Sequence, residues 1–163
     1  MNFDFLKDEK FLKAKKEKKH FFFGKVDLPL FTWDDVIPLF QNNVDNPEIF
    51  DPKIFNNCGF RLHDASPIEV VNSFQQELSK ISEFKINSHI YISLTNKSET
   101  LGYHKDDVDV IFWQVFGKTE FIVIDHQKIF KYDIKPGEVL FVPKKMTHST
   151  KPLECRFAVS LAF

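Results

Sequence analysis

Over the second half of the chain, short segments alternate between apolar and polar residues with a period of two. Because successive side chains of an extended chain point to opposite faces, this period indicates β-strands. Turn-forming residues, among them Gly117 and Pro136-Gly137, separate the segments. The sequence predicts strands near residues 86–94, 108–116, 119–124, 128–132, 138–142 and 155–162. Closely spaced short strands without intervening helices predict a barrel or a sandwich.

The residues before this region have helical spacing instead. Residues 1–19 carry seven lysines and predict a basic helix or arm. A short strand over 21–26 and irregular structure over 42–65 are expected. Thr32, with Asp35 three residues later, predicts a capped helix, and Ser66-Pro67 predicts the start of another. The apolar stripe of that second helix consists of Val70, Val71, Phe74, Leu78 and Ile81. We expect an arm over 1–20 and one domain over 21–163, with helical support at 30–83 and a barrel core at 84–163.

Composition narrows the possible functions. The formal net charge of −1 excludes a broadly basic nucleic-acid binder. Cys58 and Cys155 have no CxxC partners, which is typical of reduced thiols in an intracellular protein. No segment has the apolar length of a signal peptide or a membrane span. We therefore expect a cytoplasmic protein that does not associate with a membrane.

A candidate metal site lies before one of the most apolar predicted strands. His104 and Asp106 are two residues apart, so in an extended chain they face the same side. His148 follows 44 residues after His104 and offers a third ligand. Two histidines and one carboxylate with open positions opposite them are the ligand set of non-haem Fe(II) oxygenases. In contrast, His20, His63 and His126 lie in polar or turn-like contexts and are expected to be ordinary surface histidines.

Two segments around these residues resemble a known family. The segment His104–Phe121, HKDDVDVIFWQVFGKTEF, resembles the HxDxxDVxxxQxxG signature of the JmjC-like cupin oxygenases, which include hydroxylases of ribosomal proteins. The segment Ile134–Ser149, IKPGEVLFVPKKMTHS, is similar to the motif that ends in the family's second histidine ligand. The resemblance covers residues 84–163 well and 30–83 faintly. It implies a double-stranded β-helix (a jelly roll) preceded by helices, with Fe(II) held by His104, Asp106 and His148. It also implies 2-oxoglutarate and dioxygen as co-substrates of a hydroxylase.

The family holds the distal carboxylate of 2-oxoglutarate with a basic side chain two positions after the motif glycine. Here that position is Thr119, whereas the lysine is Lys118, which the strand alternation directs outward unless a bulge intervenes. Arg156 is the alternative, because the segment after His148 is similar to the prolyl-hydroxylase arrangement, in which an arginine follows the second histidine. Arg156 is one of only two arginines, against 20 lysines, and shares a strand face with Ser160.

Residues 89–94 add polar candidates. His89, Tyr91 and Ser93 alternate with apolar residues, so they would line the barrel interior if the apolar set packs under the helices. Tyr91 and Ser93 then either hydrogen-bond the co-substrate carboxylate or, as is more usual for a buried tyrosine, are satisfied within the protein. Asp109 either orients the metal site or is a solvated carboxylate.

Three functions remain open. The first is an Fe(II)- and 2-oxoglutarate-dependent hydroxylase, acting on a protein side chain or a small molecule rather than on nucleic acid. The second is a metal-binding cupin of other chemistry, such as a 2-oxoglutarate-independent dioxygenase or an isomerase. The third is a non-catalytic ligand-binding barrel. The sequence predicts neither the substrate nor the oligomeric state.

Overall fold

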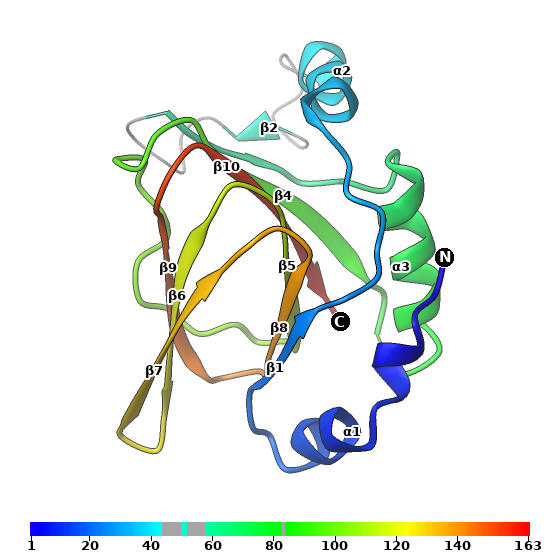
Figure 1. Cartoon of the computed structure of the whole chain (residues 1–163), viewed down its shortest axis with the longest axis vertical. Coiled ribbons are helices and arrows are strands. Elements are labelled where there is room, and N and C mark those ends of the chain that lie inside the picture. Colours follow the sequence, from blue (N-terminus) through cyan, green and yellow to red (C-terminus); the bar gives the residue numbers. More distant parts are fainter. Residues whose placement is uncertain (44–49, 52–57, 83) are drawn as a thin grey trace.

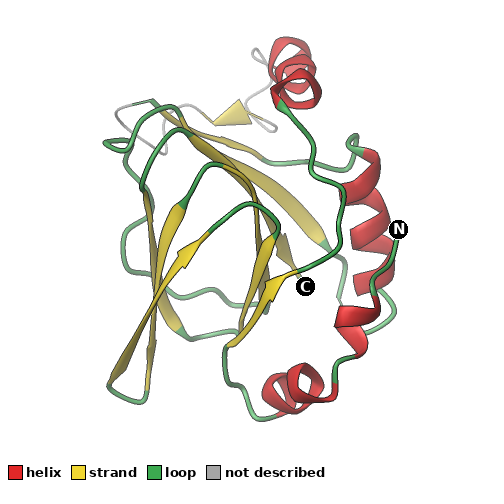
Figure 2. Ribbon diagram, viewed as in Figure 1, coloured by secondary structure: helices red, strands yellow, loops and turns green. Residues whose placement is uncertain are grey.

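The computed structural model describes residues 1–43, 50–51, 58–82 and 84–163. Its strands are β1 (Phe21–Lys25), β2 (Phe50–Asp51), β3 (Gly59–Leu62), β4 (Asn87–Ser93), β5 (Val110–Phe116), β6 (Thr119–Asp125), β7 (Lys128–Ile134), β8 (Glu138–Val142), β9 (Thr147–Pro152) and β10 (Arg156–Ala162). Its helices are the 3-10 helix η1 (Asp4–Lys7) and the α-helices α1 (Glu9–Lys16), α2 (Trp33–Asn43) and α3 (Glu69–Leu78). Figure 1 labels most of these elements, and Figure 2 colours them by type.

Two antiparallel sheets form the body of the structure. The larger sheet has the strand order β1-β8-β5-β10-β4-β3-β2, and the smaller sheet has the order β7-β6-β9. Non-consecutive strands are neighbours in both sheets, as in a jelly roll (Figure 1). The mainly β architecture with N-terminal helices predicted from the sequence is therefore confirmed. Among the described residues, no helix is both long and apolar enough to span a membrane.

Alternation along the strands gives the larger sheet two different faces. One face packs against the helices, and its core includes Phe11 of α1, Phe74 of α3 and Trp113 of β5, all fully buried. The opposite face turns toward the smaller sheet, where Phe112 and Phe121 belong to a second, smaller apolar cluster. Every second side chain of the larger sheet therefore faces the interior between the two sheets.

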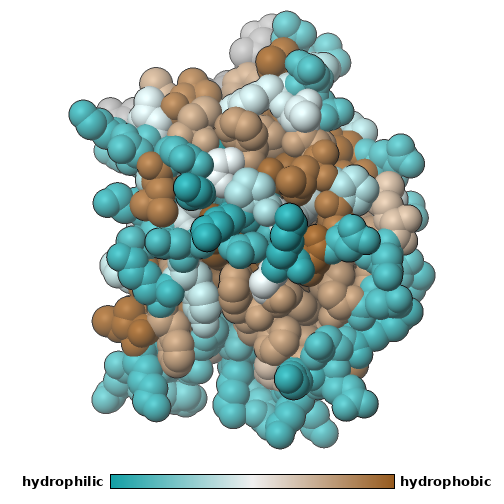
Figure 3. Space-filling model, in the orientation of Figure 1, coloured by the Kyte–Doolittle hydropathy of each residue, from teal (hydrophilic) through white to brown (hydrophobic). Residues whose placement is uncertain are grey.

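The N-terminal segment packs against the sheet with its apolar residues. Asp8 caps α1 by accepting hydrogen bonds from the backbone N–H groups of Lys10 and Phe11. Leu6 and Phe11 are buried in the core beneath the helices. Most lysines of α1 are exposed, and the surface at the lower end of the molecule, where α1 lies, is mostly hydrophilic (Figure 3).

The first predicted helix forms with the expected cap. The backbone N–H of Thr32 donates to Asp35 Oδ2 over 2.7 Å, and Thr32 Oγ1 accepts the N–H of Asp34 over 3.2 Å. These reciprocal bonds satisfy backbone groups at the start of α2. The second predicted helix begins later than expected. Ser66 and Pro67 form a turn closed by the Ile68 N–H donating to the Ala65 carbonyl, and α3 begins at Glu69.

The strand predictions were confirmed except in two places. All six strands predicted after residue 84 form, with small shifts at their ends, and β1 forms at the predicted short strand. β9 was missed because its sequence, THSTKP, has no apolar alternation. β3 lies within the stretch 42–65 that was expected to be irregular, and α2 extends to Asn43 in the same stretch. Residues 44–49 and 52–57 of that stretch lie outside the described residues.

Gly117 fixes the turn between β5 and β6. Its φ is +68°, a conformation that side-chain-bearing residues rarely adopt. A Cβ at this position would lie 2.1 Å from the Cys155 carbonyl oxygen and 2.9 Å from Cα of Arg156. Only glycine therefore lets this turn lie directly against the start of β10, which brings Thr119 and Arg156 together.

Candidate functional site: a metal-ligand triad and a buried arginine in one cavity

The metal-ligand candidates are brought together by a short backbone bridge. The N–H of His104 donates to the carbonyl of His148, and the N–H of His148 donates to the carbonyl of His104, both over 3.0 Å. This bridge joins the loop after β4 to β9, and it places the two imidazole rings 4.2 Å apart between centroids. The pairing explains how residues 44 positions apart become neighbours.

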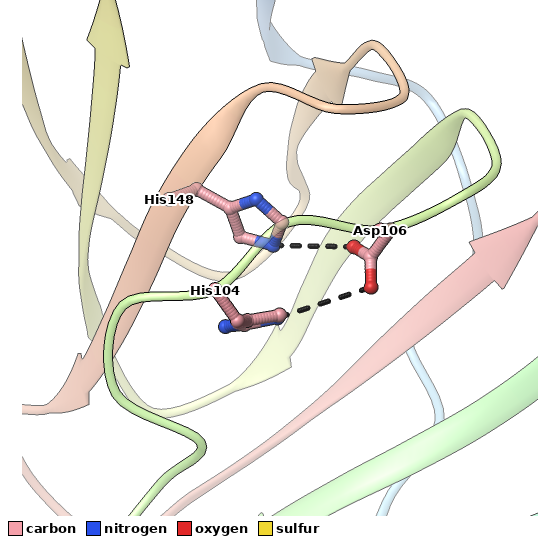
Figure 4. Close-up of side chains that lie close together, drawn as sticks. All are labelled: His104, Asp106 and His148. Atoms are coloured by element: carbon pink, nitrogen blue, oxygen red, sulfur yellow. Dashed lines mark ion pairs between the residues drawn. The ribbon is translucent and has the colours of Figure 1, made fainter.

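Asp106 completes the cluster. Its carboxylate oxygens lie 3.3 Å from Nε2 of His148 and 4.0 Å from Nε2 of His104 (Figure 4). One ligand atom from each of the three residues lies within 4.8 Å of the other two. The predicted convergence of His104, Asp106 and His148 on one point is therefore what the structure shows.

Hydrogen bonds define which nitrogen of each histidine is available. Nδ1 of His104 lies 2.9 Å from the Gly102 carbonyl oxygen, and Nδ1 of His148 lies 3.0 Å from that of Met146. A carbonyl can only accept, so Nδ1 of each ring carries a proton, and Nε2 of each ring is the atom that faces Asp106. Donation of the second ring N–H to a carbonyl is the usual way in which proteins orient metal-binding histidines.

The two ligand-bearing segments are also tied together beyond the triad. The N–H of Lys145 donates to the Asp106 carbonyl over 2.7 Å, and Asp109 Oδ1 accepts the N–H of Lys144 over 2.9 Å. Burial by itself would raise the pKa of the Asp106 carboxyl, but the hydrogen bond from His148 and the nearby histidine charges outweigh burial and lower this pKa. Asp106 is therefore an anion at neutral pH, as a metal ligand must be.

A cavity of about 310 Å³ opens beside the triad. Of the candidates from the sequence, Tyr91, Ser93, Arg156 and Ser160 line it together with His104, Asp106 and His148. The isoleucines between the polar residues of β4 pack in the core beneath the helices, which confirms the predicted inward direction of His89, Tyr91 and Ser93.

Lys118 and Thr119 do not line the cavity. Lys118 is exposed on the outside, as the strand alternation requires, and no bulge redirects it. Our expectation that Lys118 is a possible anchor for the carboxylate is therefore corrected. Thr119 is fully buried behind the cavity wall, and its Oγ1 accepts a hydrogen bond from Nη1 of Arg156 over 2.8 Å.

Arg156 is the main electrostatic feature of the cavity. It is only 2% exposed, and among the described residues no carboxylate forms an ion pair with it and Nε has no hydrogen-bond partner. Burial lowers the pKa of its guanidinium to about 10, and Tyr91 opposes this shift. Arg156 is therefore a buried cation at neutral pH, and such a charge is costly without an anionic partner.

A chain of hydrogen bonds orients this arginine. Thr119 accepts from Arg156 and donates its hydroxyl proton to Gln114 Oε1 over 2.6 Å. Gln114 Nε2 in turn donates to the backbone carbonyl of Phe116 over 2.6 Å. The sequence motif contains Gln114, but its role behind Arg156 depends on packing between β5, β6 and β10 and was not predicted.

If Arg156 binds a carboxylate ligand, for which 2-oxoglutarate is the probe that the sequence motifs imply, replacing Thr119 with valine should weaken that binding about tenfold, the effect of losing one hydrogen bond of roughly 1–1.5 kcal/mol. Valine has nearly the same shape as threonine but cannot accept from Arg156. Thr119→Ser is the matched control, because it keeps the hydroxyl and should keep most of the affinity. Calorimetric titration of the metal-loaded protein measures both variants, and equal affinity of Thr119→Val and the wild type would contradict the role of this hydrogen bond.

Two of the histidines expected on the surface are not there. His20 is largely buried, with Nε2 2.9 Å from the hydroxyl of Tyr132. His63 is half-buried, its Nε2 lies 3.3 Å from Nη2 of Arg61, and its ring lies 5.5 Å from that of His89. Only His126, whose side chain is 93% exposed, matches the expectation. Sequence reasoning missed Arg61 and His63 because it did not predict β3.

Comparison with known proteins identifies the fold. No protein-family model matches the chain, and no curated protein matches its sequence. A structure of the ribosomal oxygenase YcfD from Escherichia coli matches with a TM-score of 0.72 at 14% identity, over 100% of this chain and 53% of that chain. YcfD in complex with cobalt and 2-oxoglutarate matches with a TM-score of 0.55 at 19% identity, over 64% of this chain and 31% of that chain. Procruciferin, an 11S globulin from Brassica napus, matches with a TM-score of 0.52 at 12% identity, over 72% of this chain and 28% of that chain.

The chain spans about half or less of the length of these solved chains. An oxygenase and a globulin both match, so the fold alone does not determine an activity. The likeness to a JmjC-like cupin oxygenase that the motifs implied is confirmed for the fold: this chain has the double-stranded β-helix of the ribosomal oxygenase.

Proposed function

We propose that this protein is an Fe(II)- and 2-oxoglutarate-dependent oxygenase that hydroxylates its substrate. His104, Asp106 and His148 would hold the metal, and Arg156 would bind the distal carboxylate of 2-oxoglutarate. The observation that carries the proposal is that the triad and the buried Arg156, which has no carboxylate partner among the described residues, line the same cavity. A planar guanidinium matches a carboxylate with two parallel hydrogen bonds.

The donor set fits Fe(II). His104, Asp106 and His148 line the cavity with ligand atoms within 4.8 Å of one another, and two histidines with one carboxylate are the set with which non-haem Fe(II) sites hold the metal while leaving positions open. When bound, Fe(II) would supply the redox chemistry that couples conversion of 2-oxoglutarate and dioxygen to succinate and carbon dioxide with hydroxylation of a C–H bond. The remaining tasks belong to the side chains of this chain.

These tasks are binding, orientation and the exclusion of water. Arg156, held by Thr119, would fix one end of 2-oxoglutarate, and the Tyr91 hydroxyl and Ser93 would donate further hydrogen bonds to it from the neighbouring strand β4. Burial raises the pKa of Tyr91, although the charges of Arg61 and Arg156 oppose this, so its hydroxyl stays a donor at neutral pH. Apolar side chains of β5 and β6, including Phe112 and Phe121, form the rest of the wall and limit access of water.

The test is turnover of 2-oxoglutarate by the full chain. With Fe(II), dioxygen and a reductant that keeps the iron ferrous, the protein should form succinate, and omission of iron should abolish this. Binding of the metal without measurable affinity for 2-oxoglutarate would overturn the proposal in favour of a cupin of other chemistry. Failure to bind any divalent metal would leave a non-catalytic ligand-binding barrel as the remaining candidate function.

A further inference from the structure

A second group of basic and polar side chains lines the cavity on strands β3 and β4. Arg61 lies directly opposite Tyr91 in the register of these strands, and it opposes the rise that burial causes in the pKa of the Tyr91 hydroxyl. Nη2 of Arg61 lies 3.3 Å from Nε2 of His63, and the ring of His63 lies 5.5 Å from that of His89. Arg61, His89 and Tyr91 all contribute to the cavity wall.

Hydrogen-bonding capacity in this group is left unused. Nε of Arg61 and Nδ1 of His89 are buried, and neither has a hydrogen-bond partner among the residues that the structure describes. Among the side chains that the structure describes, which do not include that of Asp51, no carboxylate forms an ion pair with Arg61. Glu99 also lines the cavity but is exposed to solvent. Buried donors without partners in a cavity wall are costly, and an acceptor on a ligand would satisfy them.

The charge of this group is positive at neutral pH. Burial, together with the charges of Arg61 and His63, lowers the pKa of His89 to about 4, so His89 is neutral there and Arg61 supplies the cation. A neutral imidazole beside a guanidinium offers one N–H donor without adding a second charge.

The use of arginine in this chain supports a specific role. The chain contains 20 lysines and two arginines, and both arginines line this cavity. They lie on the two strands that flank β4, because β4 pairs with β3 on one side and with β10 on the other. The other basic side chains of this protein, apart from its histidines, are lysines. Arginine differs from lysine in having a planar guanidinium group that can bind a carboxylate with two parallel hydrogen bonds.

We propose that Arg61 and His89 form a second carboxylate-binding subsite, which recognises an acidic group on the substrate to be oxidised. This inference rests on the proposed function in assigning Arg156 to 2-oxoglutarate. The cavity of about 310 Å³ is at the small end of ligand pockets, so the part of the substrate that enters beside 2-oxoglutarate is about the size of a side chain. The substrate class is therefore a carboxylate, either a small carboxylic acid or the side chain of aspartate or glutamate in a peptide. A cationic group would be repelled.

The experiment uses two pairs of probes that differ only in charge. The blocked amino acids acetyl-Asp-N-methylamide and acetyl-Asn-N-methylamide represent a peptide side chain, and butyrate and butyramide represent a free acid. The full chain is loaded with Zn(II), which has no redox chemistry, and saturated with 2-oxoglutarate so that Arg156 is occupied. Binding is followed by NMR chemical-shift titration, which is suited to weak ligands.

At least one acid should bind roughly tenfold or more tightly than its amide, as expected for a charge-assisted hydrogen bond. Tighter binding of acetyl-Asp-N-methylamide would indicate a peptide side chain as the substrate, and tighter binding of butyrate would indicate a small carboxylic acid. Arg61→Gln should remove the preference for the acid, leave the affinity for zinc unchanged, and lower the affinity for 2-oxoglutarate far less than Arg156→Met does. Arg61→Lys keeps the charge and should keep part of the preference, and the NMR spectrum of each variant reports whether it is folded. Lys118→Gln, which removes a positive charge outside the cavity, is the control and should bind the acids as the wild type does.

Equal binding of acids and amides would overturn the inference. So would a loss of 2-oxoglutarate affinity in Arg61→Gln as large as that in Arg156→Met, which would make Arg61 a co-substrate anchor. Failure of the proposed function would be recognised by a different result, the absence of 2-oxoglutarate binding. If the wild type does not bind 2-oxoglutarate, the acids can be titrated without it, and their dependence on Arg61 still decides the subsite.

Discussion

Replacing His148 with alanine should abolish succinate formation and lower the affinity for Fe(II) by at least about 100-fold. Loss of a residue that only orients a ligand already costs roughly 10–100-fold in metal affinity, and His148 supplies a ligand atom itself. Its position is fixed on all sides. The backbone bridge to His104 holds the main chain, Met146 holds Nδ1, and Phe121 stacks on the ring with centroids 5.5 Å apart. Within the described part of the chain, His104, Asp106 and His148 form the one group of side chains placed to hold a metal, so no further ligand of that group replaces Nε2.

The matched control is His126→Ala. This histidine lies in an exposed turn, with a side chain 93% exposed, so its removal should change neither metal binding nor turnover. Because His148 is buried, His148→Gln serves as a second variant that fills more of the space and also lacks the imidazole. Metal affinity is measured by calorimetry and succinate formation by mass spectrometry. Wild-type iron affinity in a folded His148 variant would show that the triad is not the metal site.

The sequence predicts the fold of this chain well where side chains alternate and poorly where pairing alone defines a strand. β4, β5 and β10 have apolar residues at every second position, and these are the residues that pack beneath the helices. β9 has no such pattern. It is held in place by hydrogen bonds to β6 and by the bridge to His104, and neither can be recognised from its own sequence. The start of α3 shifted because Ser66 and Pro67 are used in a turn closed onto Ala65.

The candidate site divides in the same way. The spacing of His104 and Asp106 and the two motifs predicted the triad. The alternation along β10 placed Arg156 on the face of Ser160 but left open whether that face was inside or in solvent, and the structure shows that it lines the cavity. What the sequence could not predict was the set of contacts between strands that are distant along the chain. Thr119 occupies the position where the family that the motifs resemble has a basic residue, and the structure shows that its hydroxyl instead accepts from Arg156. Arg61 was seen only as a rare residue, because β3 was not predicted.

Replacing Arg156 with methionine should have opposite effects on binding and on stability. We expect the affinity for 2-oxoglutarate to fall roughly 100-fold or more, since removal of one partner of a buried charge pair costs about 2–5 kcal/mol. The free energy of unfolding without co-substrate should be unchanged or about 1 kcal/mol higher, because an apolar side chain of similar length does not carry the desolvation cost of a buried cation. Arg156→Lys keeps the positive charge but lacks the planar guanidinium group, and it should bind 2-oxoglutarate with intermediate affinity.

The charge of Arg156 also predicts how co-substrate binding depends on pH. Folding lowers the pKa of its guanidinium from the ordinary value of 12.5 to about 10, so the side chain is protonated at pH 7–9 and loses its charge as the pH rises through about 10. The contribution of Arg156 to 2-oxoglutarate affinity should therefore be constant from pH 7 to 9 and should decrease above that range. In Arg156→Met this decrease should disappear. Titrations of the Zn(II)-loaded proteins, with chemical denaturation for stability, test both effects. Wild-type affinity in the methionine variant would move the carboxylate anchor to another residue, whereas a large loss of stability would show that Arg156 is held in the protein for structural reasons.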